Sequence, residues 1–348
     1  MGIASHASTP VSSSRLSISA PVVHRSSRPR RPEDDVGEAA AVQWREHINE
    51  VLERNGGLAT RRELLAHVPE TVVDGYIGRR ALRRLFPHVY CRVAEPTTDD
   101  LLLRAALRHA GPVAALSHTT ALAVWGLVAF RRPVHLTVDH AVRRAGATDL
   151  VVHRRLRFRP DGPQCVTRNG FRVTALPRTL VDAWPLLPVP DRRPLLLDAA
   201  RRGLVTARGL EQALAERPNV GGHRALAQAI DLIADGCQSE LEALGVLNVF
   251  RHRSLPRSVG QHRVVLPQGA VRLDRSWPEV KLAVELDGAK HHTSPEDRRR
   301  DLARDTALAA LGWVVLRFTY ADVVRDPDLV RRRVLEVYAA RAAQLRVG

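Results

Sequence analysis

Residues 271–318 decide the fold of the C-terminal third of the chain, and they read VRLDRSWPEVKLAVELDGAKHHTSPEDRRRDLARDTALAALGWVVLRF. Residues 280–287 alternate apolar and polar side chains with the period of two that is typical of a strand. The expected core face carries Val280, Leu282, Val284 and Leu286, and the other face carries Lys281, Glu285 and Asp287. Residues 271–274 alternate likewise. We therefore predict a hairpin with its turn at 277–279, a helix over 297–311 and a buried central strand over 313–318.

An acidic residue stands on each strand of this hairpin, Asp274 on the first and Glu285 on the second. If Ser276 paired with Val280, Asp274 would lie on the wrong face, because a shift of one residue reverses every side chain. Contact between the two acids therefore requires a bulge or a different loop length. With Asp274 opposite Ala283, Glu285 would be its diagonal neighbour at about 7 Å. Two carboxylates at that separation suit a hard cation such as Mg²⁺.

An Asp on one strand and a Glu on the next resemble the PD-(D/E)XK superfamily of restriction-endonuclease-like proteins. The chain more specifically resembles a small bacterial domain family of unknown function that is related to very short patch repair endonucleases. The motifs of that family are R-x-D-x-x-W-P, V-E-x-D-G, D-R-x-R-D and L-G-W-x-V-L-R-F. They are matched in order by Arg272, Asp274, Trp277, Pro278, Val284, Glu285, Asp287, Gly288, Asp297, Arg298, Arg300, Asp301 and residues 311–318.

This resemblance implies a C-terminal αβββαβ domain that hydrolyses phosphodiester bonds in DNA with Mg²⁺ or Mn²⁺. Asp274 and Glu285 would hold the metal ion, Asp287 would complete the site, and Arg298 and Arg300 would contact the DNA backbone. Taken singly, the acids are also compatible with solvated charges on a strand face. Surface ion pairs within the helix are the corresponding alternative for the arginines.

The chain departs from the superfamily pattern at the position where a Lys is usual, because Asp287 stands there. The usual activation of water by Lys therefore cannot be transferred to this chain. Lys281 lies about 13 Å away along the strand, which leaves Lys290 or His291 as the candidate general base. An exposed polar loop is the alternative interpretation of these two residues.

Residues 238–242 open the helix that precedes the hairpin. The S-x-x-E phrase of the family matches Ser239 and Glu242, which implies that Glu242 adds a third acidic group to the site. Glu240 is a second candidate for that role. The same spacing is also typical of a capping box with Ser at the N-cap and Glu at N3. Both interpretations of Glu242 stay open.

The whole chain is strongly basic, with 348 residues, a formal net charge of +16 and a pI of about 11.2. Such a charge favours a polyanionic partner, because neutralised phosphates release counterions. We expect DNA, and the charge alone does not exclude RNA. Cys91, Cys165 and Cys237 are widely spaced and predict free thiols in a reducing bacterial cytoplasm. No apolar run approaches the ~20 residues of a membrane span, so we expect no membrane partner.

Composition divides the chain into four segments. We expect a disordered basic tail over 1–40, a winged helix-turn-helix over 41–96, an α/β middle domain over 97–236 and the endonuclease-like domain over 237–348. In the second segment we predict helices over 42–53 and 70–85, a short helix between them with a capping box of Thr60 and Glu63, and a β wing over 86–93.

The phrase G-L-A-T-R-x-E-L-L, followed by the wing, resembles the N-terminal domain of AbiEi-type antitoxins, which regulate transcription in abortive-infection toxin systems. The resemblance implies a cognate toxin as a partner. It also implies that the third helix meets DNA phosphates or base edges. The arginines expected on that helix are Arg79, Arg80, Arg83 and Arg84. A solvated helix face is the alternative.

The middle segment resembles the same antitoxins and offers no chemical motif. His118 follows Ser117 without an acidic partner at a suitable spacing, so we interpret it as a helix-cap residue. We interpret His135 and His153 as strand-face residues.

The sequence thus predicts a multidomain α+β and α/β protein that binds DNA and hydrolyses it with a metal ion. The alternative is a non-enzymatic transcription regulator or antitoxin with a degenerate nuclease domain. The oligomeric state and the recognised DNA site do not follow from the sequence.

Overall fold

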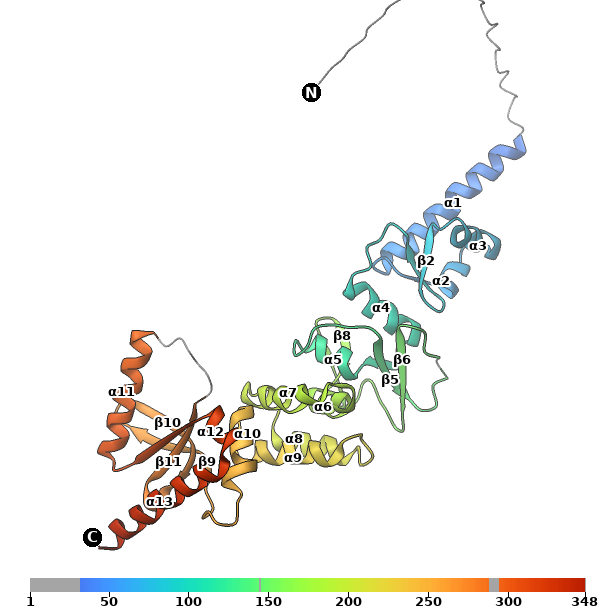
Figure 1. Cartoon of the computed structure of the whole chain (residues 1–348). Helices are drawn as coiled ribbons and strands as arrows, with labels where there is room; N and C mark the ends of the chain where they lie inside the picture. The colour runs from blue at the N-terminus through green and yellow to red at the C-terminus, as the bar shows by residue number, and fades with distance from the viewer. Residues whose placement is uncertain (1–31, 144, 288–293, 348) are drawn as a thin grey trace, which may run out of the picture.

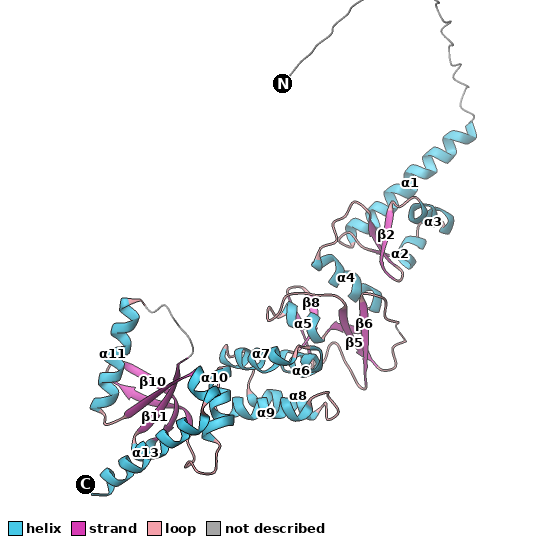
Figure 2. Cartoon of the chain, in the orientation of Figure 1, coloured by secondary structure: helices cyan, strands magenta, loops and turns pink. Residues whose placement is uncertain are grey.

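The computed structural model describes residues 32–143, 145–287 and 294–347, which form three parts that follow one another along the molecule (Figure 1). We call them the N-terminal part (up to residue 96), the middle part (97–236) and the C-terminal part (from 237). Each part contains one β-sheet with helices packed beside it (Figure 2). None of the helices in the described ranges is long and apolar enough to cross a membrane. The architecture is therefore mixed α and β, as predicted.

The N-terminal part combines three helices with a small antiparallel sheet. Its elements are α1 (Pro32–Arg54), β1 (Ala59–Thr60), α2 (Arg61–Leu65), α3 (Glu70–Gly78), β2 (Leu82–Phe86) and β3 (Val89–Arg92), and the sheet order is β1-β3-β2. The predicted capping box is present, because the Thr60 hydroxyl accepts from the backbone of Glu63 and the Glu63 carboxylate accepts from the backbone of Thr60. This exchange satisfies two free N–H groups and fixes the start of α2.

Helix α3 ends at Gly78, much earlier than predicted. Arg80 has a left-handed φ of 58°, and residues 82–86 then pair with β3 as a strand with both ends buried. The low helix propensity of Gly75 and Gly78 accounts for the early end. The prediction of a helix over 70–85 is therefore wrong. The four arginines expected on it lie on different elements: Arg79 and Arg80 follow α3, and Arg83 and Arg84 lie on β2.

Helix α1 begins at Pro32, ten residues before the predicted start of the first helix. The expected tail over 1–40 therefore includes nine residues, 32–40, that are helical in the structure. Residues 1–31 lie outside the described residues.

The middle part places a five-stranded mixed sheet between helix α4 and a helical layer. Its elements are α4 (Asp99–Ala110), β4 (Ala114–Leu116), α5 (His118–Val124), β5 (Val134–Asp139), β6 (Leu150–Arg155), β7 (Cys165–Arg168), β8 (Phe171–Thr174), α6 (Leu176–Ala183), α7 (Val189–Arg201), α8 (Ala207–Ala215) and α9 (His223–Ala234). The sheet order is β6-β5-β4-β8-β7. Strands β4 and β5 are antiparallel, whereas β5 and β6 are parallel.

The C-terminal part contains a four-stranded sheet with the order β12-β11-β10-β9. Its elements are α10 (Glu240–Gly245), β9 (Val259–Leu266), β10 (Gly269–Trp277), β11 (Leu282–Asp287), α11 (Pro295–Ala310), β12 (Val314–Thr319), α12 (Tyr320–Arg325) and α13 (Pro327–Val347). Strands β9, β10 and β11 are antiparallel neighbours, and β12 runs parallel to β11. The predicted hairpin, helix and third strand are thus all present.

Helices cover both faces of this sheet. Leu282 and Val284 of β11 pack with α10 and α13, whereas Ala283 packs against Leu308 of α11. Strand β11 is therefore covered on both sides. Its predicted apolar face is buried, and Glu285, on the face predicted to be polar, is buried as well. Strand β12 differs from the prediction, because it lies at the edge of the sheet and is only partly buried.

Neighbouring parts share hydrophobic cores. Leu58 and Phe86 of the N-terminal part belong to one core with Leu136 of β5. Leu232 of α9 belongs to one core with Trp277 of β10. The middle part is therefore packed directly against both of its neighbours.

Candidate functional site

The two acids of the hairpin lie at the end of the pairing between β10 and β11. Arg275 pairs with Val284, and continuing that register by one residue places Asp274 level with Glu285. The prediction of Asp274 opposite Ala283 is therefore wrong in register. The two side chains nevertheless belong to the same side of the ladder, because directly opposite residues in an antiparallel pair point the same way.

The turn between the strands accounts for this register. Residues 278–280 form a short 3₁₀ turn, and Lys281 has a left-handed φ of 50°. Trp277, which the sequence placed in the turn, instead pairs with Leu282 as the last residue of β10. The connection is therefore longer than the two-residue turn that a simple hairpin would use.

The strands separate where the acids lie, and side chains replace the backbone pairing. The backbone N–H of Leu286 donates to Asp274 Oδ2 at 3.0 Å. Gln261 of β9 donates through Nε2 to Asp274 Oδ1 at 3.3 Å and to Glu242 Oε2 at 3.1 Å. Gln261 therefore links a carboxylate of the sheet to a carboxylate of α10.

Glu242 lies in the first turn of α10 and also contacts Gln261, which binds Asp274. Ser239 is the N-cap of α10 and accepts from the backbone of Glu242 at 3.2 Å, as the capping interpretation predicted. The Glu242 carboxylate accepts from the backbone of Gln238 at 3.0 Å and from Gln261. The two interpretations are therefore compatible. Glu240, the second candidate, is ion-paired with Arg193 of α7.

A guanidinium from α11 lies beside Glu285. Arg304 Nη2 forms an ion pair with Glu285 Oε1 and also donates to the carbonyl of Arg272 at 3.3 Å. Glu285 is buried and Arg304 is partly buried. Lys281 lies away from the site, because its Nζ donates to the carbonyl of Leu311 at 2.9 Å.

The surroundings of Glu242, Asp274 and Glu285 disfavour the charged form of each carboxyl group. Burial raises the pKa of Glu242, Asp274 and Glu285 above their ordinary values, and the charge of Asp274 raises the pKa of the other two further. Hydrogen bonds from Gln238 and Leu286 oppose the rise in pKa for Glu242 and Asp274, and the charge of Arg304 opposes it for Glu285. An added cation would stabilise the charged form of all three groups.

These oxygens fit a hard divalent cation only in part. Within residues 32–143, 145–287 and 294–347, no group of three or more His, Cys, Asp and Glu side chains is placed to hold a metal ion. Mg²⁺ commonly binds through one or two carboxylates and completes its shell with water and phosphate oxygens. Asp274 and Glu285 could therefore supply the protein ligands, with Gln261 and Glu242 around them.

Comparison with known proteins assigns the C-terminal part and relates most of the chain to one protein. The family model REase_MTES_1575, of a restriction endonuclease-like family, matches residues 268–337. The uncharacterized protein Rv2248 of Mycobacterium tuberculosis strain H37Rv is 30% identical over 269 residues, which cover 75% of this chain and 94% of Rv2248. The chain belongs to the family of Rv2248. Its C-terminal part is a restriction endonuclease-like domain.

Two further similarities are more limited. An uncharacterized protein of Haemophilus influenzae is 36% identical over 56 residues, which cover 16% of this chain and 46% of that protein. The crystal structure of the RV2827C protein from Mycobacterium tuberculosis covers 65% of this chain and 89% of its own, with a TM-score of 0.43 and 16% identity.

The other predicted site residues of this domain lie at the margin of the three carboxylates or away from them. Asp287 ends β11 and is exposed, yet its charge acts on Asp274 and raises the pKa of that carboxyl. Arg298 is exposed on α11. Arg300 is exposed and ion-paired with Asp297. Lys290 and His291, the candidate general bases, lie outside the described residues.

The predicted DNA-binding arginines of the N-terminal part have mixed surroundings. Arg79, Arg80 and Arg84 are exposed, whereas Arg83 donates to the carbonyl of Glu95 at 2.8 Å. Helix α3 itself is acidic on its exposed side, where Glu70 and Asp74 both bind Arg61 at 2.8 and 2.7 Å. Helix α3 therefore lacks the basic face that the sequence predicted for it.

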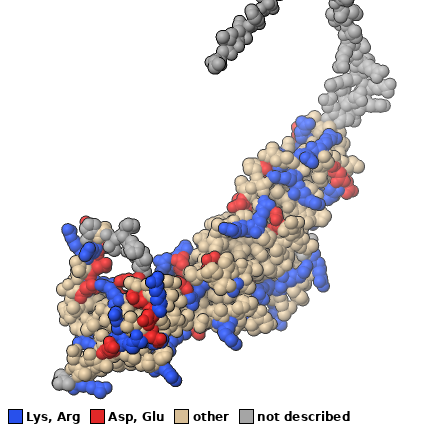
Figure 3. Space-filling model, viewed as in Figure 1, with Lys and Arg blue, Asp and Glu red and all other residues tan. Residues whose placement is uncertain are grey.

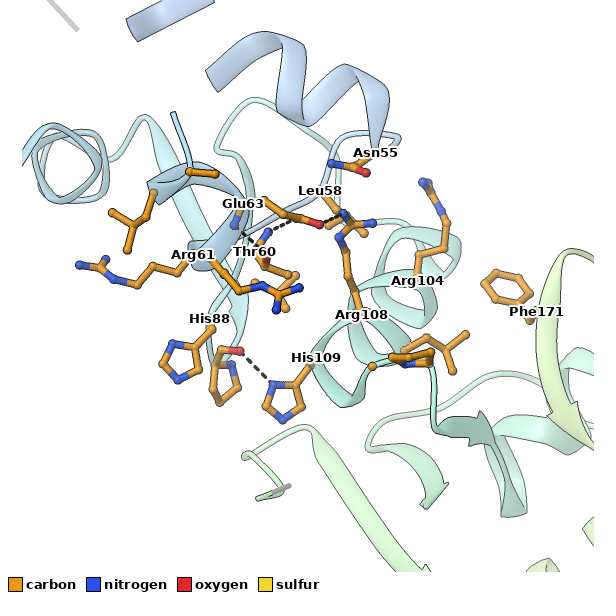
Figure 4. A pocket seen from close by; sticks show the side chains of 18 of the residues that line it. Asn55, Leu58, Thr60, Arg61, Glu63, His88, Arg104, Arg108, His109 and Phe171 are labelled. Carbon is orange, nitrogen blue, oxygen red and sulfur yellow. Dashed lines mark hydrogen bonds and ion pairs between the residues drawn. The ribbon is translucent and has the colours of Figure 1, made fainter. Parts of the chain in front are cut away.

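A cavity of about 1390 Å³ lies between the N-terminal and middle parts (Figure 4). Arg104 and Arg108 of α4 lie along it, together with Thr60 and Glu63 of the N-terminal part. Arg108 is ion-paired with Glu63, and Arg104 with Asp100. The charges of this cavity are thus largely balanced within the protein.

Gln261 and Arg304 lie at the nuclease-like site although no pattern in the sequence predicts them there. Gln261 lies on β9 with a left-handed φ of 49°, and no spacing rule indicates it. Arg304 follows Asp301 by three residues, a spacing that indicates only a surface pair. The three histidines of the middle part were interpreted as isolated residues, yet the structure brings all of them together.

Proposed function

We propose that this protein binds DNA and that its C-terminal domain hydrolyses phosphodiester bonds with Mg²⁺ or Mn²⁺. The observation that supports this most is the level position of Asp274 and Glu285 at the point where β10 and β11 separate. Both residues lie within the range matched by the restriction endonuclease-like model. The family model gives the class of domain, and the paired carboxylates support the chemistry proposed for it.

In this proposal Asp274 and Glu285 hold the metal ion. Glu242 and Asp287 complete or orient the site, and Gln261 keeps the carboxylates of Asp274 and Glu242 in place through its two hydrogen bonds. A bound divalent cation would lower the pKa of an attacking water and offset charge on the phosphate. Lys290 and His291 remain the candidates for the base that accepts the proton from water.

DNA binding is supported by the formal charge of +16 and by the order of elements in the N-terminal part. The order α1-β1-α2-α3-β2-β3 is that of a winged helix, with β2 and β3 as the wing. We propose that Arg79, Arg80 and Arg84 contact phosphates beside the acidic α3, and that Arg298 and Arg300 do so near the nuclease site. On the face drawn in Figure 3, Lys and Arg side chains are spread over all three parts.

A second candidate function is a non-enzymatic DNA-binding regulator or antitoxin with a cognate toxin. The observation that favours it is the ion pair of Arg304 with Glu285, because a guanidinium there competes with a metal ion for the same carboxylate. The presence of Asp287 in place of the usual Lys points the same way.

The deciding experiment is cleavage of supercoiled plasmid by the full chain with Mg²⁺ or Mn²⁺. Wild-type protein should nick or cut the plasmid, and Asp274→Ala and Glu285→Ala should each lower the rate at least about 100-fold, since each removes a metal ligand. Glu336→Ala, which removes an exposed carboxylate of α13, is the matched control. Metal-independent cutting, or cutting that both variants retain, would reject the assignment. Wild-type protein that shifts DNA in a gel with steep salt dependence and never cuts would favour the regulator.

A further inference from the structure

One face of the middle sheet is polar where a core would be apolar. Val134, Leu136 and Val138 of β5 pack into the core on one side of the strand. His135 and Thr137 alternate with them and therefore point to the other side. Thr137 pairs with His153 of the neighbouring strand β6, so these side chains share a face. His135 and Thr137 are both buried, and burying polar groups is costly unless they are hydrogen-bonded.

Three imidazole rings meet on this face. The rings of His118 and His153 are stacked, with centroids 3.6 Å apart and planes inclined by 16°. His135 Nδ1 and His153 Nε2 are 3.0 Å apart, within hydrogen-bonding distance. Ser117 adds a hydroxyl, whose Oγ is 2.9 Å from His118 Nδ1. The cluster therefore gathers groups that can donate hydrogen bonds within one small volume.

The backbone holds His118 in an uncommon conformation. His118 connects β4 to α5 and has a left-handed φ of 53°. A side chain other than Gly is strained in this region, and such strain often marks a functional site. The sharp turn from strand to helix places His118 over His153.

Arginines surround the histidines and outnumber the acids. Asp182 of α6 is buried and binds Arg155 of β6, Arg178 Nε at 2.7 Å and Arg217 Nε at 3.1 Å. Glu216 binds Arg178 Nη1 at 2.7 Å. Three guanidinium groups thus share two carboxylates, and Arg155 and Arg217 lie near enough to the rings to lower the pKa of His118 and His153. Arg217 is partly exposed, so the cluster reaches the surface on that side.

Thr137 lacks a hydrogen-bond partner for its side chain. Its residue is 1% exposed, and among the described residues its hydroxyl makes no hydrogen bond. Buried hydroxyl groups are normally paired, and an exception calls for a missing partner. Thr137 lies level with His153, so that partner would sit beside the histidines.

We propose that this cluster binds the phosphate group of a small phosphate monoester or of inorganic phosphate. A phosphate offers only acceptors on at least three oxygens, and the cluster offers hydroxyl, imidazole and guanidinium donors. The excess of arginine favours an anion and disfavours a metal cation. Neither the nuclease-like site nor the N-terminal arginines contribute to this site.

The protonation states of the rings agree with a donor site for anions. Burial is the main cause that lowers the pKa of all three rings. For His118 and His153 the neighbouring histidines and the cations Arg155 and Arg217 add to this effect, whereas Asp182 acts in the opposite direction on His153. Together these causes place the pKa of His118 far below its ordinary value and that of His153 at about 4. The rings are therefore neutral near pH 7. A bound anion would raise their pKa values.

The test measures binding by calorimetry and thermal stabilisation of the full chain at pH 7.5. The probes are inorganic phosphate and a nucleoside 5′-monophosphate, each compared with chloride at matched ionic strength. Wild-type protein should bind saturably. Thr137→Val should weaken the affinity about tenfold, because it removes one hydrogen bond to a charged ligand. Thr167→Val, on an exposed position of β7, is the matched control and should bind as wild type does.

Thr137→Val should fold, because it replaces an unpaired buried hydroxyl with a methyl group of similar size. Tighter binding of the monophosphate would identify a nucleotide ligand, and equal binding would identify the free anion. The double variant with Asp274→Ala and Glu285→Ala should keep the response, which separates this site from the nuclease-like site. Absence of saturable binding, or equal affinity of the two Thr variants, would overturn the proposal. Stabilisation by Zn²⁺ without any by phosphate would also overturn it, in favour of a metal site.

Discussion

Removal of the Arg304 guanidinium should reveal how strongly Glu285 depends on it. Glu285 is 7% exposed, and its ion pair with Arg304 is shielded by β11 and α11. Breaking a buried pair by removing one partner costs about 3–5 kcal/mol, because an unpaired charge remains inside. Arg304 is partly exposed and Glu285 can take up a proton, so we expect Arg304→Ala to lower the free energy of unfolding by about 2–3 kcal/mol in the absence of metal.

Urea unfolding at pH 7.5, followed by tryptophan fluorescence, measures this effect. Mg²⁺ should stabilise Arg304→Ala more than wild type, because the ion no longer competes with a guanidinium for Glu285. Addition of Glu285→Gln to Arg304→Ala should recover most of the lost stability, since the buried charge is then absent. Arg300→Ala is the control, because the pair of Arg300 with Asp297 is exposed and should contribute nothing measurable.

An Arg304→Ala variant that is no more destabilised than Arg300→Ala would contradict the proposed dependence of Glu285 on Arg304. Equal stabilisation of wild type and Arg304→Ala by Mg²⁺ would also contradict it, because the guanidinium and the ion would then not share a carboxylate. A strong response to Mg²⁺ in Glu285→Gln would move the metal ion away from Glu285 altogether.

Two further predictions concern charge inside the protein. Asp274→Asn should raise the free energy of unfolding in metal-free buffer at pH 7.5 by about 1 kcal/mol, because it removes a buried charge that repels Glu242 and Glu285. A loss of stability in the same urea assay would contradict the cause given for the raised pKa values. Acidification below pH 6.5 should destabilise the middle part. The pKa of His153 is lowered to about 4 in the folded protein, mainly by burial, whereas a His in an unfolded chain has a pKa near 6.5. Between these two values the unfolded state binds more protons, so the free energy of unfolding falls as the pH falls. Each such histidine contributes at most about 1.4 kcal/mol per pH unit to the slope of the free energy of unfolding against pH. His153→Asn should therefore make the thermal unfolding temperature depend less on pH. His140→Asn, at an exposed position, is the control and should leave this dependence unchanged.

The elements of the C-terminal domain could be predicted because their signals are local. The alternation in residues 280–287 marks the buried strand whichever partner it takes, and the core face of that strand is buried as predicted. The capping boxes depend on residues three apart, so Thr60 with Glu63 is fixed by the sequence. Patterns of this kind need no knowledge of the rest of the fold.

The register of the hairpin could not be predicted, because it depends on the conformation of the turn. The left-handed Lys281 and the short 3₁₀ turn change which residues oppose one another. No composition signal distinguishes this from a bulge or a longer loop, since Lys has no preference for a positive φ. Burial nevertheless decides which face of each strand points to the core. The two acids therefore lie on the same side of the sheet, although the predicted pairing partner of Asp274 was wrong.

The histidine cluster could not be predicted either, because its members come from three elements. His118 begins α5, His135 lies on β5 and His153 lies on β6. Each residue alone has an ordinary explanation at its own position in the sequence. Only the parallel pairing of β5 with β6 and the turn into α5 bring the rings within stacking distance.

Charge balance at the nuclease-like site favours the metal-binding proposal over the regulator. The charge of Asp274 raises the pKa of Glu242 and of Glu285, and within the part of the chain that the structure describes Arg304 is the cation that forms an ion pair with one of the three, Glu285. Three carboxylates and one guanidinium leave two negative charges in a largely buried region, and uncompensated buried charge destabilises a fold. A single divalent cation would neutralise that remainder. A domain that served only to bind DNA would gain from neutral residues at these positions, because a negative pocket repels phosphates. Arg304 of α11 places a positive charge beside Glu285, so the absence of a Lys at position 287 is compatible with the metal-binding proposal.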